Sequence, residues 1–154
     1  MKKPIFLNLT LYAYFMKIYI AGKLWEKKDR EIVENIDKIC RALGHETFLP
    51  HRDAGIYDGK RDSLPIFKKD RDMVDWCDVM VAVLDWKGIS SGTAWEIGYA
   101  YAKKIPIIAL VDDIKSVNKT YRTCVMCFNS AKLVENIEDL KKELMKIEKI
   151  NLKN

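Results

Sequence analysis

The sequence predicts an α/β fold in which a roughly five-stranded parallel sheet is doubly wound, with helices on both faces. The runs 78–84 and 106–111 are short and almost wholly apolar, which is typical of strands buried on both faces of a parallel sheet. Runs with helical spacing of apolar residues alternate with such strand-like runs along the chain. Because parallel neighbours need a crossover connection, this alternation predicts a three-layer, flavodoxin- or Rossmann-like architecture.

The first strand and the first helix are expected after residue 16. Residues 17–21 form a short β-rich run that ends at Gly22. The helix that follows ends at Gly44 and has apolar residues at three-to-four spacing, which are Ile32, Val33, Ile36, Ile39, Cys40 and Leu43. A brief second strand is expected at 47–49.

A polar, glycine-containing stretch over 50–62 is expected to form a loop that is long enough to act as a functional lid. Ser63 with Pro65 begins the next helix. Its apolar residues are Ile66, Met73, Val74 and Trp76.

The second half of the chain continues the alternation. Between the two apolar strands, a helix that contains Glu96 is expected to extend to about Lys104. The last strand is expected at 123–128, with 131–134 as a short extension. The final helix has an apolar face made of Ile137, Leu140, Leu144 and Ile147.

The length of 154 residues, 49% of them hydrophobic, is that of one globular domain, which we expect to span 16–154. Residues 1–15 contain Lys2 and Lys3 before an apolar run that lacks the length of a membrane-spanning helix and any cleavage site. We interpret this as a mis-assigned start, with Met16 as the functional start, or else residues 1–15 are an N-terminal appendage. A cytoplasmic protein without a membrane partner is expected.

The net charge of +5 comes from interleaved lysines, arginines and acidic residues, which is compatible with a phosphorylated small substrate. No basic stripe with interleaved aromatics indicates a nucleic-acid partner. The four cysteines do not resemble a disulfide scaffold, and Cys124 with Cys127 forms a lone CxxC in an apolar, strand-like run. Buried thiols are therefore favoured over a metal or redox site, and neither a metal nor a cofactor is expected.

Glu96 is the main candidate for chemistry. It follows an apolar strand and a Ser/Gly turn, so we place it in the first turn of a helix at the crevice where open α/β sheets bind ligands. Turn amides and the helix dipole favour an anion there, which predicts that Glu96 stays ionised at neutral pH and can act as a nucleophile. The alternative is a capping box, with Thr93 as N-cap and Glu96 bonding back to its amide.

A second carboxylate, Asp70, is expected to face the same crevice, together with Tyr19 near the end of the first strand. Enzymes that cleave glycosidic bonds commonly use two carboxyl groups that flank the bond. For Asp70 the alternative is an exposed, salt-bridged helix surface, because it lies among lysines and arginines. Further candidates for the crevice are Gly22, Lys23, Ser91 and Gly92.

Two segments and one acidic residue together resemble the nucleoside 2-deoxyribosyltransferase superfamily, which includes the 2'-deoxynucleoside 5'-phosphate N-hydrolases. They are Tyr19-Ile-Ala-Gly22, Asp70 seven residues before the central strand begins, and Ser-Gly-Thr-Ala-Trp-Glu-Ile-Gly from Ser91. The resemblance spans Met16 to about Val134. It implies that Glu96 attacks C1' of a deoxyribosyl unit to form a covalent intermediate, that Asp70 assists base departure, and that Tyr19 positions Glu96 or the sugar.

The chain departs from the transferases at Ser91, where they usually have an acidic residue. A hydroxyl beside Gly92 at a helix N-terminus suits a phosphate oxygen, and Lys23, His51 or Arg52 could add positive charge. The departure favours hydrolysis of 2'-deoxynucleoside 5'-monophosphates over base exchange between deoxynucleosides. A non-catalytic nucleotide-binding module is the alternative of another class.

The resemblance also implies a homodimer or higher homo-oligomer, because family sites are completed across a subunit interface. The residues donated there come from the region near 124–129. Asn129 and Ser130 are our candidates for that substrate-binding role.

Overall fold

The computed structural model describes residues 15–85, 87–117 and 124–152. The predicted appendage therefore lies, apart from Phe15, outside the described residues. Within these ranges, no helix combines the length and the apolar character needed to cross a membrane.

Within the described residues, five strands form one parallel sheet, as the sequence predicts, and their order is β2-β1-β3-β4-β5. Their bounds are Lys17–Ala21 for β1, Glu46–Phe48 for β2, Val79–Leu84 for β3, Ile107–Val111 for β4 and Lys132–Val134 for β5. The doubly wound α/β fold class is confirmed.

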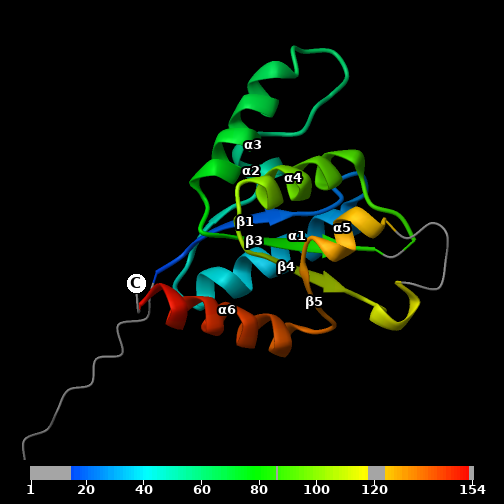
Figure 1. The fold of residues 1–154 in the computed structure, drawn as a ribbon. Coiled ribbons are helices and arrows are strands. Elements are labelled where there is room, and N and C mark those ends of the chain that lie inside the picture. The colour runs from blue at the N-terminus through cyan, green and yellow to red at the C-terminus, as the bar shows by residue number, and fades with distance from the viewer. Residues whose placement is uncertain (1–14, 86, 118–123, 153–154) are drawn as a thin grey trace, which may run out of the picture.

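Helices cover both faces of the sheet (Figure 1). On one face lie α1 (Lys27–Ala42) and α6 (Ile137–Asn151), and on the other lie α3 (Leu64–Trp76), α4 (Ser91–Ala102) and α5 (Val125–Asn129). Two shorter elements complete the fold, α2 (Pro50–Asp53) and the 3-10 turn η1 (Ile114–Ser116).

The alternation of side chains along β1 divides the core into two layers. Ile18 and Ile20 pack with the buried residues of α1 and α6, whereas Tyr19 and Ala21 pack with those of α3, α4 and α5. Tyr19 is therefore directed toward the helix that contains Glu96.

Two predicted elements differ from the structure. The strand expected at 123–128 is wrong for its described part, because 125–129 form α5 and the strand follows as β5. Cys127 and Phe128 are buried while Val125 and Met126 are exposed, a two-and-two pattern that a strand would not produce. The expected loop over 50–62 begins instead with α2, which starts at Pro50.

The strand β2 is added on one side of β1, and the later strands β3, β4 and β5 are added on the other side. The topological switch point therefore lies between β1 and β3, and a crevice for ligands is expected at the carboxyl ends of these strands. Gly22 follows β1 at this point. A Cβ built on Gly22 would lie 2.7 Å from Val33 Cγ1 of α1. Glycine is thus needed here because α1 approaches the backbone closely.

Candidate active site

Tyr19 of β1 and Glu96 of α4 form the core of the site. The fully buried Tyr19 donates a hydrogen bond from its hydroxyl to Glu96 Oε1 over 2.7 Å. The Tyr19 ring packs against Phe48 with centroids 5.3 Å apart, which holds the hydroxyl in place. The carboxylate of Glu96 is thereby held against β1.

The helix cap is made by another residue. Ser90 is the N-cap of α4, and its Oγ accepts from the Thr93 amide over 3.2 Å. Because α4 begins at Ser91, Glu96 lies in the second turn and not in the first as predicted. The capping-box alternative for Thr93 and Glu96 is therefore wrong, and the Glu96 side chain does not cap the helix.

Asp70 of α3 and Glu96 line one pocket of about 210 Å³. Its other lining residues are Gly22, Leu24, Trp25, Pro50, Ser90, Ser91, Gly92 and Thr93. Asp70 Oδ1 is buried and has no hydrogen-bond partner among the described residues. The salt-bridged surface that was the alternative for Asp70 is formed instead by Arg71 with Asp72, 2.5 Å apart.

Burial shifts both carboxyl groups toward the protonated form. It raises the pKa of Glu96 to about 8, opposed by the hydrogen bond from Tyr19 and reinforced by the charge of Asp70. Burial also raises the pKa of Asp70 to about 6. The expectation that Glu96 is ionised at neutral pH is wrong for the free protein, because the effect of burial outweighs that of the hydrogen bond from Tyr19.

The two shifted groups share protons in a definite range of pH. Between about pH 6 and about pH 8, the pair formed by Asp70 and Glu96 holds one proton. One carboxylate and one carboxylic acid in a single pocket are the protonation state that glycosidic cleavage needs, since one group attacks and the other donates a proton.

The start of α4 is open toward the same pocket. Ser91 and Gly92 are exposed and line it, and the Ser91 hydroxyl has no hydrogen-bond partner among the described residues. A Cβ built on Gly92 would meet no atom within 4 Å, so the space in front of this backbone is free. Helix N-termini of this kind bind anions through their unpaired amides.

Comparison with known proteins identifies the family of this chain. The model of the family described as nucleoside 2-deoxyribosyltransferase matches residues 18–145. The chain belongs to this family. It is thus an enzyme of the transferase or hydrolase type that acts on N-glycosidic bonds, as the resemblance of its motifs implied. No curated protein matches the sequence significantly.

Solved structures share the fold along most of their length. A 2-deoxyribosyltransferase from Bacillus psychrosaccharolyticus is 23% identical with a TM-score of 0.67, and the match covers 80% of this chain and 89% of that one. A conserved protein from Enterococcus faecalis is 29% identical, with a TM-score of 0.66 and coverage of 86% and 98%. A CMP N-glycosidase from Clostridium botulinum is 21% identical, with a TM-score of 0.53 and coverage of 90% and 99%.

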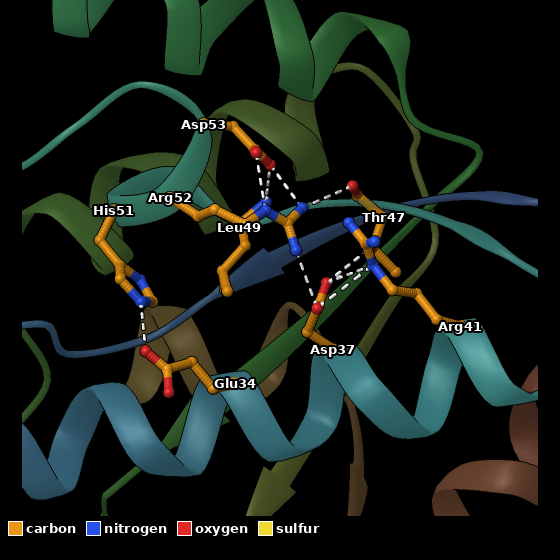
Figure 2. Close-up of polar contacts among 8 residues, drawn as sticks. All are labelled: Glu34, Asp37, Arg41, Thr47, Leu49, His51, Arg52 and Asp53. Atoms are coloured by element: carbon orange, nitrogen blue, oxygen red, sulfur yellow. Dashed lines mark hydrogen bonds and ion pairs between the residues drawn. The ribbon is translucent and has the colours of Figure 1, made fainter.

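The cationic residues predicted for this deoxyribosyltransferase-like site are paired elsewhere. Lys23 Nζ lies 3.1 Å from Asp85 Oδ2 and lines a different pocket, of about 260 Å³, beside α1. Figure 2 shows His51 bonded to Glu34, at 2.9 Å, and Arg52 bonded to Asp37. The structure therefore does not place any of these three residues in the lining of the candidate pocket.

The contacts of Arg52 have a structural purpose. Its guanidinium joins the buried Asp37 of α1, at 2.8 Å, to Asp53 of α2, at 2.6 Å, and also donates to the Thr47 carbonyl (Figure 2). This network ties the segment 47–53 to α1. It thereby fixes Pro50, which lines the pocket that contains Asp70 and Glu96.

Asn129 and Ser130 lie at the end of α5, outside this pocket. Their side chains donate to the carbonyls of Val125 and Met126, at 2.7 and 2.6 Å, and line a pocket between α4 and α5. Their contribution to the site of a neighbouring subunit stays a prediction.

Trp25 and Pro50 are pocket residues that sequence reasoning missed. Trp25 is 71% exposed at the mouth of the pocket, where an indole is available for stacking on a planar ligand. An isolated tryptophan in a charged turn directly after Gly22 is the signal that could have found it. Pro50 lines the pocket because α2 begins there, and the sequence around it contains no motif that predicts this position.

Proposed function

We propose that the protein hydrolyses the N-glycosidic bond of 2'-deoxynucleoside 5'-monophosphates through a covalent deoxyribosyl intermediate on Glu96. The observation that carries this proposal is the hydrogen bond of 2.7 Å from Tyr19 to Glu96 Oε1 in a pocket shared with Asp70. Tyr19 orients one oxygen of the carboxylate, which leaves Oε2 as the oxygen that attacks.

The first step forms the bond between Glu96 Oε2 and C1' as the bond between C1' and the base breaks. The electron pair of that bond leaves with the base, which takes a proton from Asp70. The free protein holds the shared proton on Glu96, because its pKa of about 8 is the higher of the two. Positive charge developing on the sugar favours ionised Glu96, so the proton moves to Asp70 as the substrate reacts.

The second step releases the sugar. A water molecule attacks C1' while Asp70, now ionised, takes its proton, and the bond from C1' to Glu96 Oε2 breaks. The products are the free base and 2-deoxyribose 5-phosphate. The proton then passes from Asp70 back to Glu96, so both carboxyl groups return to their starting state.

The preference for a 5'-phosphate rests on the start of α4. The Ser91 hydroxyl, which has no hydrogen-bond partner in the described part of the chain, and the open backbone at Gly92 both line the pocket. Neither residue is acidic, so neither would repel a phosphate. Because Lys23, His51 and Arg52 are paired with carboxylates, the helix terminus is the main source of phosphate recognition.

Base exchange between deoxynucleosides is the second candidate. It uses the same Glu96 intermediate with a base in place of water, and the exposed Trp25 at the pocket mouth favours it as a platform on which bases could be exchanged. A non-catalytic binding module is disfavoured. Under that hypothesis Glu96 would serve only to cap the helix, but the cap is made by Ser90.

Chromatography of released base decides between the two activities. The protein is incubated with each deoxynucleoside and each 5'-monophosphate, with and without a second base. Base release from monophosphates alone supports the hydrolase, and exchange that appears only with the second base supports the transferase. Release must disappear in Glu96→Gln and persist in Glu135→Gln, which changes an exposed glutamate outside the pocket.

Substitution of Ser91 tests the phosphate site separately. Ser91→Asp places a carboxylate where the phosphate would lie and is expected to lower monophosphate turnover more than nucleoside turnover. Equal loss on both substrates would contradict a phosphate role for Ser91.

We also propose that a second copy of this chain covers an aromatic surface on α3 and α4. Phe67 and Trp95 are 44% and 45% exposed, their rings are 5.4 Å apart, and Tyr99 stacks on Trp95. Exposed apolar patches of this kind mark interaction surfaces. Light scattering should show an oligomer that Trp95→Ser weakens and that Ile150→Ser, on the exposed side of α6, does not.

A further inference from the structure

The two cysteines of the CxxC motif are in contact at the start of α5. Cys124 Sγ and Cys127 Sγ lie 2.8 Å apart, and both thiols are free. Cys124 is the N-cap residue and is half-buried, whereas Cys127 is 3% exposed. Between them, Val125 and Met126 are 59% and 75% exposed, so this turn faces solvent. The buried strand that was expected to hold both thiols does not form.

The other two cysteines lack this arrangement. Cys40 and Cys77 are buried in separate core layers, and Cys77 bonds to the Val74 carbonyl rather than to a thiol. Burial raises the pKa of each to about 12, and among the described residues neither thiol contacts a second sulfur that could complete a disulfide. They serve as internal controls for a property of the CxxC pair.

We propose that Cys124 and Cys127 form a reversible disulfide site that is oxidised by low-molecular-weight disulfides. The proposal stands on the contact between the two sulfurs and on the unequal exposure of the two residues. A soft metal ion is a poorer occupant, because among the described residues no group of three or more potential ligands surrounds any point. The redox site is separate from the Glu96 pocket and does not depend on the proposed function.

The exchange takes place in two steps. The Cys124 thiolate attacks one sulfur of the small disulfide, forming a mixed disulfide and releasing one small thiolate. The Cys127 thiolate then attacks the Cys124 sulfur and releases the second small thiolate, and the two protein protons pass through solvent to the released thiolates. The balance is two protein thiols and one small disulfide converted into one protein disulfide and two small thiols.

The unequal exposure sets the order of attack. Cys124 is reachable from solvent, whereas burial, reinforced by the neighbouring Cys124 thiol, raises the pKa of Cys127 to about 12. Cys127 therefore acts as the resolving residue and not as the first nucleophile.

Oxidation should stiffen α5 without rearranging the fold. The helix is five residues long, and its first turn is closed by the hydrogen bond from the Phe128 amide to the Cys124 carbonyl over 3.1 Å. A disulfide between Cys124 and Cys127 spans the same turn. It would therefore hold this hydrogen bond closed.

The test is incubation of the native protein with oxidised glutathione, followed by alkylation and peptide mass spectrometry. We expect one internal disulfide between Cys124 and Cys127, no stable glutathione adduct, full reversal by dithiothreitol, and free thiols at Cys40 and Cys77. Cys127→Ser should accumulate a glutathione adduct at Cys124, because the resolving thiol is gone. Cys124→Ser should leave Cys127 unmodified.

A stable adduct on the wild-type protein, or no reaction at all, would overturn the proposal. Hydrogen exchange gives a second measure that does not rely on trapping. Oxidation should slow exchange of the Phe128 amide in the wild type and leave it unchanged in Cys127→Ser, and an equal change in both would also overturn the proposal.

Discussion

The Tyr19 hydroxyl donates to Glu96 Oε1 over 2.7 Å, which joins the first strand to a helix residue that lies 77 positions later in the chain. The bond lies in a region from which water is largely removed, so it stabilises the ionised form of Glu96 more than it would at the surface. Tyr19 thereby controls both the position and the proton affinity of the candidate nucleophile.

Replacing Tyr19 by Phe removes this bond and keeps the ring that packs on Phe48. The pKa of Glu96 should rise further above about 8, because the bond from Tyr19 opposes the effect of burial. A hydrogen bond to a charged group contributes about 1.5–3 kcal/mol, so kcat/KM should fall by roughly 10- to 100-fold. Steady-state kinetics over a range of pH measure both effects, and an unchanged alkaline limb would contradict the role given to Tyr19.

The dependence of kcat/KM on pH should be bell-shaped. Below about pH 6 both carboxyls are protonated and no nucleophile is present, and above about pH 8 both are ionised and no acid remains. The profile of kcat/KM should therefore have its maximum near neutral pH. A profile that is flat from pH 5 to 9 would show that the two groups do not act as an acid and a nucleophile.

Glu96→Gln should stabilise the protein at alkaline pH. The folded-state pKa of Glu96, about 8, lies above its ordinary value of 4.5, so the folded protein loses stability as pH rises through this interval. Glutamine avoids the buried charge and can still accept from Tyr19. Urea unfolding should show a gain that is absent at pH 4 and reaches on the order of 5 kcal/mol at pH 9, since each pKa unit corresponds to about 1.4 kcal/mol.

The control for this measurement is Glu135→Gln, at an exposed position, which should show no such pH dependence. A gain that is equal at pH 4 and pH 9 would contradict the buried, proton-binding state of Glu96.

Two glycines of the pocket should respond differently to alanine. Gly22→Ala places a Cβ 2.7 Å from Val33 Cγ1 and should destabilise the fold by about 1–3 kcal/mol, with partial recovery in the double variant with Val33→Ala. In Gly92→Ala the added Cβ meets no atom within 4 Å, so the stability of the protein should be nearly unchanged. The Cβ occupies the open space where the phosphate is proposed to bind, so KM for a monophosphate should rise. Thermal unfolding with kinetics on both variants separates the two roles, and equal destabilisation would contradict the assignment.

The sequence predicted β3 and β4 well because both strands are continuous apolar runs whose type does not depend on distant contacts. It was less informative at the start of α4, where Ser90, Ser91 and Thr93 are all good caps and local propensity does not choose among them. Only the fold shows that Ser90 makes the cap, which releases Glu96 to bond with Tyr19. The assignment of 125–129 failed for a related reason, since a helix of five residues has too few turns to reveal its period.

The properties of the site that depend on tertiary burial could not be predicted. The Ser/Gly turn before Glu96 indicated an anion-stabilising helix start, but the pKa of about 8 arises from packing against β1 and α3. The pairing of Arg52 with Asp37, and of Lys23 with Asp85, likewise joins elements that are distant in sequence. Charged residues near a motif are therefore weak evidence for a binding role until their partners are known.

The central claim is that Glu96 becomes covalently linked to the sugar, and trapping that ester tests it most directly. A 2'-fluoro-2'-deoxyarabinosyl 5'-monophosphate slows both steps, because fluorine disfavours positive charge at C1', and acid quenching followed by peptide mass spectrometry locates any adduct. The account predicts the fluorosugar phosphate on the peptide at Glu96, and no adduct in Glu96→Gln. Release of base from the natural substrate with no adduct at Glu96, or with the adduct on Asp70, would contradict it.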